Sequence, residues 1–382
     1  MLGRRAFLQL SGLAAAGTCL SPFAGASATD VQVLRIRKSE IEVAPGHRFI
    51  TTTYNDQFPG PLLRTTVGAT VRVDVVNETD STEQIHWQGQ EVSSGLVPPR
   101  SRRRMEFTPS RAGLYLYHSA VVAAADLGAG LYSGQAGALL VEAAGAERES
   151  LVVLKGCEPF MRRTLRGCEV GYSALTVNGH LPGPLRASTG DRVLFQVLNA
   201  GATETLELQL PGHMFELTAL DGNPLDAPLQ VGALQLSPGE RVAARVVINQ
   251  PTRWVVREAG HAPTLFTGTN IGVPDEVIPI RLTRYPAARS GFNRWSMSRP
   301  TLRVDAGARY RLQIHNTSDE IIPLHLQRHR LQVHGVMKDV AVVGPQQRLE
   351  VDFVADGRGP ALLHCTRQLH SDFGLRTRVD YS

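Results

Sequence analysis

RTTVGATVRVDVVN, residues 64–77, decides the fold of this chain, because its pattern occurs three times. An arginine, a glycine four residues later and an asparagine nine residues after that recur in RASTGDRVLFQVLN (186–199) and RVDAGARYRLQIHN (303–316). After each glycine, apolar residues alternate with other residues, which is the period of a half-buried strand. The repeats begin at 64, 186 and 303. This spacing is typical of β-sandwich domains and too long for solenoid units.

Further echoes support the repeat. YNDQFPGP (54–61) matches VNGHLPGP (177–184), and HMF (213–215) matches HRL (329–331). The equivalent positions of His213 and His329 predict that both are structural. The 36 Gly and 23 Pro suit many short strands joined by tight turns. We therefore predict an all-β chain of three consecutive sandwich domains, covering residues 29–146, 147–278 and 279–382.

The first 28 residues indicate an export signal. RRAFL (4–8) leads into an apolar stretch that ends at Leu20, and small residues follow before the expected cleavage point. The paired arginines predict a twin-arginine signal, with an ordinary secretory signal as the alternative. We therefore expect a periplasmic protein. The apolar stretch is shorter than the ~20 residues of a membrane-spanning helix. No later stretch reaches that length, so we expect no transmembrane span.

Charge is spread along the chain without blocks of one sign. The formal net charge is +5, from 40 Lys and Arg against 35 Asp and Glu. A nucleic-acid-binding surface would concentrate Lys and Arg in a patch or stripe. We therefore expect no nucleic-acid partner and look for partners among periplasmic or cell-envelope proteins.

Three cysteines follow the predicted signal. Cys157 and Cys168 lie 11 residues apart, each next to a glycine, in a compartment expected to be oxidising. They are the candidate disulfide. Cys365 is the odd cysteine, and it lies between His364 and His370, both potential metal ligands.

Four further segments place histidines in the first and last predicted domains. They are IHWQGQ (85–90), YHSA (117–120), PLHLQRH (323–329) and HCTRQLH (364–370). Together with YNDQFPGP, VNGHLPGP and GLYSGQAGALLVE (130–142), they resemble landmarks of the multicopper oxidases over essentially the whole mature chain. The resemblance implies three cupredoxin-like Greek-key domains, with a three-copper cluster between the first and the third.

Each of the four segments in that family supplies a histidine pair, and this chain keeps one member of each. The retained residues are His86, His118, His325 and His364, and the replacements are Gln88, Ala120, Gln327 and Thr366. Imidazole suits copper, and strand residues at i and i+2 point to the same side. The resemblance implies that His86 and His325 are a complete type-2 pair. Each type-3 copper would keep a single imidazole, so it also implies that a coupled dicopper pair is absent.

The electron-entry site of that family is incomplete as well. A blue type-1 copper needs two His, one Cys thiolate and a weak axial group. The resemblance assigns Cys365, His370 and Leu375 to three of these roles, but Ile322 stands where the second His belongs. We therefore expect no laccase-type four-electron oxidation. Cys365 then reads as a buried apolar thiol and His370 as a surface or rim histidine.

Two functions are compatible with these residues. The first is a metal-free periplasmic binding or scaffold module, because the chain resembles a copper-free septal-ring protein of bacterial cell division. The second is a copper-binding protein or oxidoreductase, with one type-2-like copper at His86 and His325. In that case Gln88 and Gln327 would hydrogen-bond around the ion. The cofactor prediction is therefore either none or one copper ion.

Overall fold

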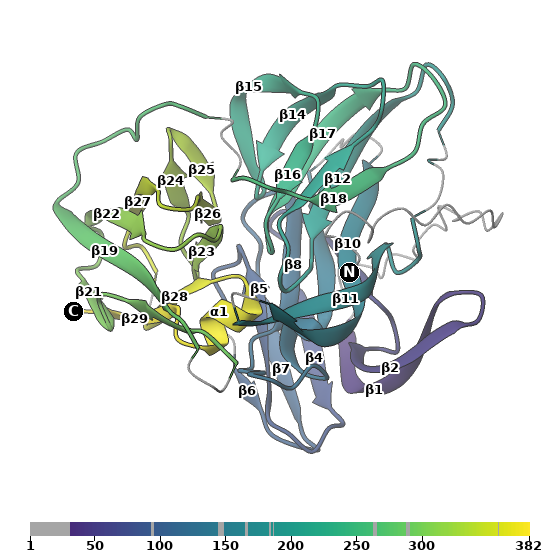
Figure 1. The fold of residues 1–382 in the computed structure, drawn as a ribbon, viewed down its shortest axis with the longest axis horizontal. Helices are drawn as coiled ribbons and strands as arrows, with labels where there is room; N and C mark the ends of the chain where they lie inside the picture. Colours follow the sequence, from purple (N-terminus) through teal and green to yellow (C-terminus); the bar gives the residue numbers. More distant parts are fainter. Residues whose placement is uncertain are drawn as a thin grey trace.

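The computed structural model describes residues 31–92, 95–143, 149–164, 167–182, 185, 187–262, 266–287, 291–357 and 359–382. These residues are mainly strands and form three β-sandwiches (Figure 1). The predicted export signal and the boundary after residue 146 lie outside the described residues. In the described ranges, no helix combines the length and the hydropathy needed to cross a membrane.

The first sandwich packs sheet β2-β1-β4-β7 against sheet β3-β9-β8-β5-β6. Leu34, Val73 and Trp87 fill the core between the sheets. Its elements are β1 (Gln32–Ala44), β2 (His47–Tyr54), β3 (Gly60–Thr66), β4 (Val71–Asn77), β5 (Glu83–Gln88), β6 (Leu96–Val97), β7 (Arg102–Phe107), β8 (Gly113–Ser119), the 3-10 helix η1 (Gly130–Tyr132) and β9 (Ala136–Glu142).

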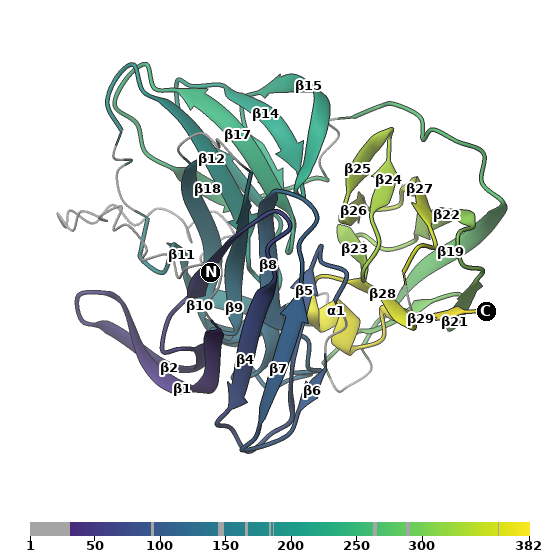
Figure 2. The ribbon, with the colours of Figure 1, turned by 180° about the vertical axis from the view of Figure 1, so that it is seen from behind.

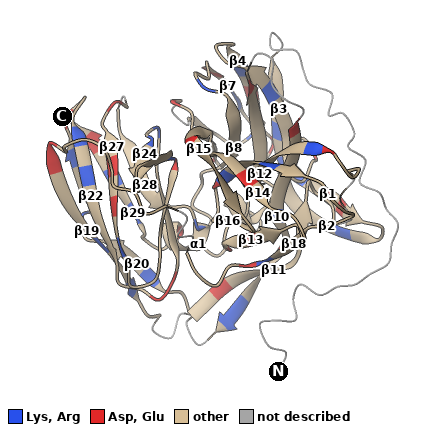
Figure 3. Cartoon of the chain, turned by 90° about the horizontal axis from the view of Figure 1, so that it is seen from above, with Lys and Arg blue, Asp and Glu red and all other residues tan. Residues whose placement is uncertain are grey.

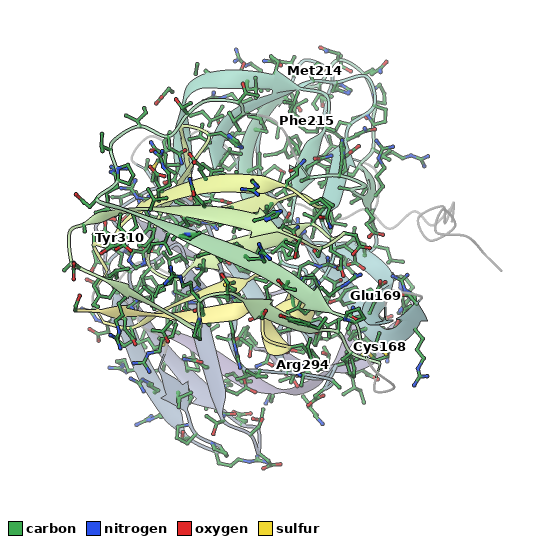
Figure 4. The ribbon with its side chains drawn as sticks, turned by 60° about the vertical axis from the view of Figure 1, so that its left-hand side comes forward. Cys168, Glu169, Met214, Phe215, Arg294 and Tyr310 are labelled. Atoms are coloured by element: carbon green, nitrogen blue, oxygen red, sulfur yellow. The ribbon has the colours of Figure 1, made fainter. Side chains whose placement is uncertain are left out.

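The second sandwich packs sheet β11-β10-β12-β17-β14-β15 against sheet β16-β13-β18. Phe215 is buried in its core, whereas the preceding Met214 is exposed (Figure 4). Its strands are β10 (Glu149–Thr164), β11 (Gly167–Val177), β12 (Arg192–Asn199), β13 (Leu206–Gln209), β14 (Phe215–Leu220), β15 (Asn223–Val231), β16 (Leu234–Leu236), β17 (Arg241–Val247) and β18 (Val255–Glu258).

The third sandwich packs sheet β20-β19-β22-β27-β24-β25 against sheet β21-β29-β28-β23-β26. Its first strand begins at Glu276, just before the position where the sequence placed the third domain. Its elements are β19 (Glu276–Tyr285), β20 (Arg294–Met297), β21 (Thr301–Val304), β22 (Arg309–Asn316), β23 (Ile322–Leu326), β24 (Leu331–Val333), β25 (Val336–Lys338), β26 (Val340–Val343), β27 (Arg348–Val354), β28 (Ala361–Cys365), α1 (Gln368–Asp372) and β29 (Arg376–Tyr381).

The threefold motif forms the same turn and strand in every sandwich. Its glycines have positive backbone φ angles, which glycine adopts without steric cost, at Gly68 (80°), Gly190 (95°) and Gly307 (85°). The strands that follow, β4, β12 and β22, pair in parallel with the first strand of their sandwich. The motif ends in a buried asparagine whose amide donates to a carbonyl of the opposite sheet, as Asn77 to Val97, Asn199 to Leu236 and Asn316 to Val343. The asparagine of each repeat therefore joins the two sheets of its sandwich.

The first and third sandwiches meet around two strand pairs. β5 pairs antiparallel with β8, and β23 pairs antiparallel with β28. The helix α1 contacts η1 of the first domain and β28 of the third, and both views draw it where these two sandwiches meet (Figure 1 and Figure 2). Asp372 of α1 accepts hydrogen bonds from the backbone N–H groups of Ala123 (3.0 Å) and Ala124 (2.8 Å) in the first domain. These contacts hold the two strand pairs against each other.

The predicted disulfide between Cys157 and Cys168 is wrong. In the β10–β11 ladder, Cys157 lies opposite Ala174 and Cys168 lies opposite Arg163. The cysteines are therefore about 20 Å apart along the ribbon at ~3.3 Å per residue, whereas a disulfide needs Cα atoms within about 7 Å. Both thiols are free. Cys168 lies beside Glu169 near one end of β11 (Figure 4).

Acidic and basic residues are interspersed over the strands (Figure 3). Many arginines face a carboxylate, as Arg104 faces Asp74 at 2.7 Å and Arg100 faces Asp80 at 2.7 Å. This distribution agrees with the mixed, solvated surface expected from the sequence.

Candidate metal centre

The structure brings the four retained histidines together from two domains. His86 on β5 lies directly across the ladder from His118 on β8, and His325 on β23 lies across from His364 on β28. The ring centroids of His86 and His325 are 5.3 Å apart, and those of His325 and His364 are 5.6 Å apart. The sequence motifs thus place four imidazoles in one interdomain cluster.

The shortest contact in this cluster crosses the domain interface. The Nε2 atoms of His86 and His325 are 3.2 Å apart and form a hydrogen bond. His86 also meets His118 edge to face, with 5.4 Å between the ring centroids. His86 and His325, which the resemblance assigns to a type-2 copper, therefore meet across the interface, and His118 and His364 lie across the ladders from them.

Three of the imidazoles are oriented by backbone carbonyls. His118 Nδ1 lies 2.8 Å from the carbonyl of Ser119, and His325 Nδ1 lies 2.8 Å from the carbonyl of Asp339. His364 Nδ1 lies 3.0 Å from the carbonyl of Cys365. A neutral imidazole in this position carries its proton on Nδ1 and donates it, which leaves the Nε2 lone pair available. The Nε2 of His364 is buried and has no hydrogen-bond partner.

Burial keeps the four imidazoles neutral at neutral pH. It lowers the pKa of His118 and that of His364 to about 4. Burial, together with repulsion between the imidazolium forms, also places the pKa of His86 and that of His325 well below the usual value of 6.5. Neutral imidazole is the form that binds metals.

The positions of the lost histidines are occupied in different ways. Gln88 is buried, and its amide donates to the carbonyl of Gly239 in the second domain at 2.9 Å. The buried hydroxyl of Thr366 has no hydrogen-bond partner. Gln88 therefore links the second domain to β5, which carries His86. The sequence did not predict this contact because Gly239 is far away in the chain.

A small cavity adjoins the cluster. Its volume is ≈ 60 Å³, and its lining includes His86, His118, His364 and Thr366, with Asp372 from α1. This space holds a few water-sized molecules. It has room for an ion with its waters or for a diatomic ligand.

The residues that the resemblance assigned to the electron-entry site lie in the core of the third domain. Ile322 is fully buried in the third-domain core, and Cys365 and Leu375 belong to the same core. The Cys365 Sγ lies 3.6 Å from His370 Nδ1, so the thiol and one imidazole of the family site remain neighbours. Burial raises the pKa of the Cys365 thiol to about 12, which keeps it protonated.

His370 is buried, so its expected position at the surface or rim is wrong. Its ring stacks on Trp295 with centroids 4.1 Å apart, and its Nε2 lies 3.1 Å from Glu320 Oε2. Arg367 and Arg284 also pair with Glu320, at 2.9 and 3.0 Å. Burial opposes ionisation of Glu320, but the hydrogen bond from His370 and the two guanidinium groups outweigh it and lower its pKa. No sequence motif pointed to this acidic residue.

A second polar network positions His325 and joins all three domains. The buried guanidinium of Arg241 pairs with Asp339 and donates to the Leu114 carbonyl at 3.1 Å. The Asp339 carbonyl in turn receives the His325 Nδ1–H. Asp221 accepts the Asp339 N–H at 3.0 Å. No sequence pattern predicts this network, because its residues come from distant segments of the chain.

The two histidines predicted to be structural are confirmed in that role. His213 Nδ1 contacts the Pro211 carbonyl at 3.0 Å, and its Nε2 accepts the Asn249 N–H at 3.0 Å. His329 Nδ1 contacts the Gln327 carbonyl at 2.8 Å, and its Nε2 bonds to the Tyr381 hydroxyl. Both rings have both nitrogens occupied, which leaves no lone pair for a metal.

Comparisons with known proteins agree with this architecture. Three multicopper oxidase family models match residues 35–145, 164–288 and 262–382. A multicopper oxidase of Mycobacterium tuberculosis is 24% identical, with 87% of this chain and 83% of the relative covered. A Staphylococcus aureus multicopper oxidase is 20% identical, with 91% and 87% covered.

Solved structures show the same fold. A multicopper oxidase from Pseudomonas thermotolerans has a TM-score of 0.76 at 24% identity, covering 92% of this chain and 99% of that chain. A metallo-oxidase from Campylobacter jejuni has a TM-score of 0.74 at 18% identity, covering 91% and 90%. The family models, the relatives and the three sandwiches agree, and the chain belongs to the multicopper oxidase family.

Proposed function

We propose that this protein is an exported copper-binding member of its family that holds a single copper ion at the four-histidine cluster. The observation that carries the proposal is the 3.2 Å separation of the His86 and His325 Nε2 atoms. Two nitrogens that each bond one ion at ~2.0–2.1 Å stand about this far apart at a roughly tetrahedral angle. His118 and His364 would complete the ligand set from either side.

The state of the ring nitrogens supports the same assignment. A buried imidazole nitrogen without a hydrogen bond costs free energy unless a ligand satisfies it. His364 Nε2 is such an atom, although its Nδ1 is well oriented at the Cys365 carbonyl. Four neutral imidazoles, three of them buried and that of His364 partly buried, form a donor set suited to copper. The residues therefore fit one ion, and they favour copper binding over the metal-free scaffold that the sequence put first.

Bound copper supplies one-electron redox chemistry, and the surrounding residues limit its use. Ile322 fills the position of the electron-entry ligand, and each lost type-3 partner is replaced by a residue without imidazole. The protein residues orient the imidazoles and keep them neutral. We therefore propose copper binding or storage in the periplasm, with export through the twin-arginine route, and no four-electron oxidation.

Copper titration of the purified chain tests the proposal. In a Cys157→Ser chain, which keeps copper from binding the buried Cys157 thiol, we expect one copper per chain, a mononuclear type-2 signal in electron paramagnetic resonance, and a rise in melting temperature. An ion bound only to the native state adds about 2.7 kcal/mol at a hundredfold excess over Kd. The His86→Ala, His325→Ala double variant should lose the signal and the rise. His180→Ala is the matched control, since His180 is exposed and outside the cluster.

Two outcomes would contradict the proposal. If wild type and the double variant respond alike to copper, the cluster holds no ion, and the metal-free scaffold becomes the better account. If copper binds in an exchange-coupled pair with no paramagnetic signal, a second ion is present and the single-ion assignment fails.

A further inference from the structure

A second group of metal-binding side chains lies away from the four-histidine cluster, between the first and second domains. His47 begins β2, whereas Cys157 and Glu158 are neighbours on β10. One ligand atom from each residue lies within 4.8 Å of the other two. His47 Nε2 and Glu158 Oε2 are the closest pair, at 2.6 Å.

The backbone of β10 is distorted where it forms this group. Successive strand residues normally point to opposite faces, which would separate the thiol of Cys157 from the carboxylate of Glu158. Glu158 instead has a φ of 50°, a left-handed conformation that is uncommon for a residue with a side chain. The ladder continues on both sides, from Cys157–Ala174 to Pro159–Tyr172. Strain held in an otherwise regular strand marks candidate functional positions.

The three side chains differ in their exposure to solvent. Cys157 is buried and packs with Ile41, Val43 and Phe58. The side chains of His47 and Glu158 are 34% and 33% exposed, so solvent reaches the group from their side. Burial raises the pKa of the Cys157 thiol to about 11, and Lys155, which lies on the same face of β10 two residues earlier, opposes that rise.

We propose that His47, Cys157 and Glu158 form a second metal site for a divalent cation of the zinc class. Thiolate sulfur, imidazole nitrogen and carboxylate oxygen are the three ligand types that zinc uses. Three protein ligands leave a fourth position open toward solvent, where water binds. The metal would join β2 of the first domain to β10 of the second. The site uses none of the four cluster histidines, so it stands or falls independently of the proposed function.

Cobalt titration of the full mature chain tests this site, because a thiolate bound to Co²⁺ gives an intense near-ultraviolet charge-transfer band. We expect the band in wild type and its loss on addition of zinc. Cys157→Ser should abolish the band, whereas Cys365→Ser and Cys168→Ser, which alter the other two thiols, should keep it. His47→Ala and Glu158→Gln should each weaken zinc binding at least about tenfold.

The four-histidine cluster contributes no thiolate, so the His86→Ala, His325→Ala double variant should keep the band. The proposal is overturned if wild type shows no band, because His47 and Glu158 then form an ion pair only. A band that persists in Cys157→Ser, or zinc affinity unchanged in His47→Ala, would equally overturn it. His47 is partly exposed, so its replacement leaves the fold intact and the comparison valid.

Discussion

His86 and His325, which are 239 residues apart in the chain, face each other with their Nε2 atoms 3.2 Å apart. The first residue comes from β5 of the first sandwich, and the second from β23 of the third. Their contact places the four-histidine cluster at the interface between two domains, so the proposed copper binding should stabilise the docking of the two sandwiches.

Copper binding should resist acid more than it does at an ordinary histidine site. Burial holds the pKa of His118 and that of His364 at about 4, so in the native state protons do not compete with copper between pH 7 and pH 5. We expect an unchanged copper affinity over that range and a decline as the pH approaches 4. Calorimetric titration at several pH values measures this. A tenfold loss between pH 7 and pH 6 would show that the ligands are exposed imidazoles.

The copper-loaded wild type should have no intense blue thiolate band and no laccase activity on phenols. Ile322 provides no ligand, although Cys365 Sγ and His370 Nδ1 remain 3.6 Å apart. We expect Ile322→His to create a blue band on copper addition, and Ile322→His with Cys365→Ser to lack it. Absorption spectroscopy decides the matter. A wild-type blue band that disappears in Cys365→Ala would disprove the prediction.

Removing Arg241 should destabilise the fold strongly. Its guanidinium is buried against Asp339, and losing one partner of a buried pair costs about 3–5 kcal/mol. We expect Arg241→Met to lower the free energy of unfolding by that amount in urea. The Arg241→Met, Asp339→Leu double variant should be less destabilised than the sum of the two single variants. As a surface control, Arg100→Met, which breaks the exposed pair with Asp80, should cost less than about 1 kcal/mol.

If Arg241→Met and Arg100→Met lower the free energy of unfolding equally, the buried Arg241 network contributes nothing to stability. Because Asp339 also holds His325, Arg241→Met should in addition weaken copper binding. Copper titration of Arg241→Met, at temperatures where the variant is still folded, tests this second consequence separately from stability.

Lys155 should make the free energy of unfolding rise with pH above about 7. Its buried amino group donates to the carbonyls of Leu131 (3.0 Å) and Ala200 (3.3 Å), and burial lowers its pKa from 10.5 to about 7. Between these values the unfolded chain binds more protons than the native one, so stability rises with pH. The rise is at most about 1.4 kcal/mol per pH unit from this group.

Urea unfolding at pH 7, 8 and 9 measures that slope. We expect Lys155→Met to remove this contribution to the slope, and Lys38→Met, at an exposed position of β1, to leave the wild-type slope unchanged. Parallel pH profiles for wild type and Lys155→Met would mean that Lys155 stays charged in the native state.

The sequence by itself determined the sandwich architecture and the content of the histidine cluster. The glycine turn, alternating strand and terminal asparagine of residues 64–77 recur because each sandwich needs a left-handed turn and an amide that joins its two sheets. These are local requirements, written in consecutive residues. The four histidines could be assigned for the same reason, since each lies inside a short motif.

Only the tertiary structure decided how these parts meet. The strand register separated Cys157 from Cys168 and turned the expected disulfide into two free thiols, because an 11-residue spacing does not fix which residues lie opposite each other. Burial of His370 against Glu320, and of Arg241 against Asp339, joins segments that no sequence pattern relates. Electrostatic environment and metal-ligand geometry depend on such long-range contacts, and they arise only when the three sandwiches pack.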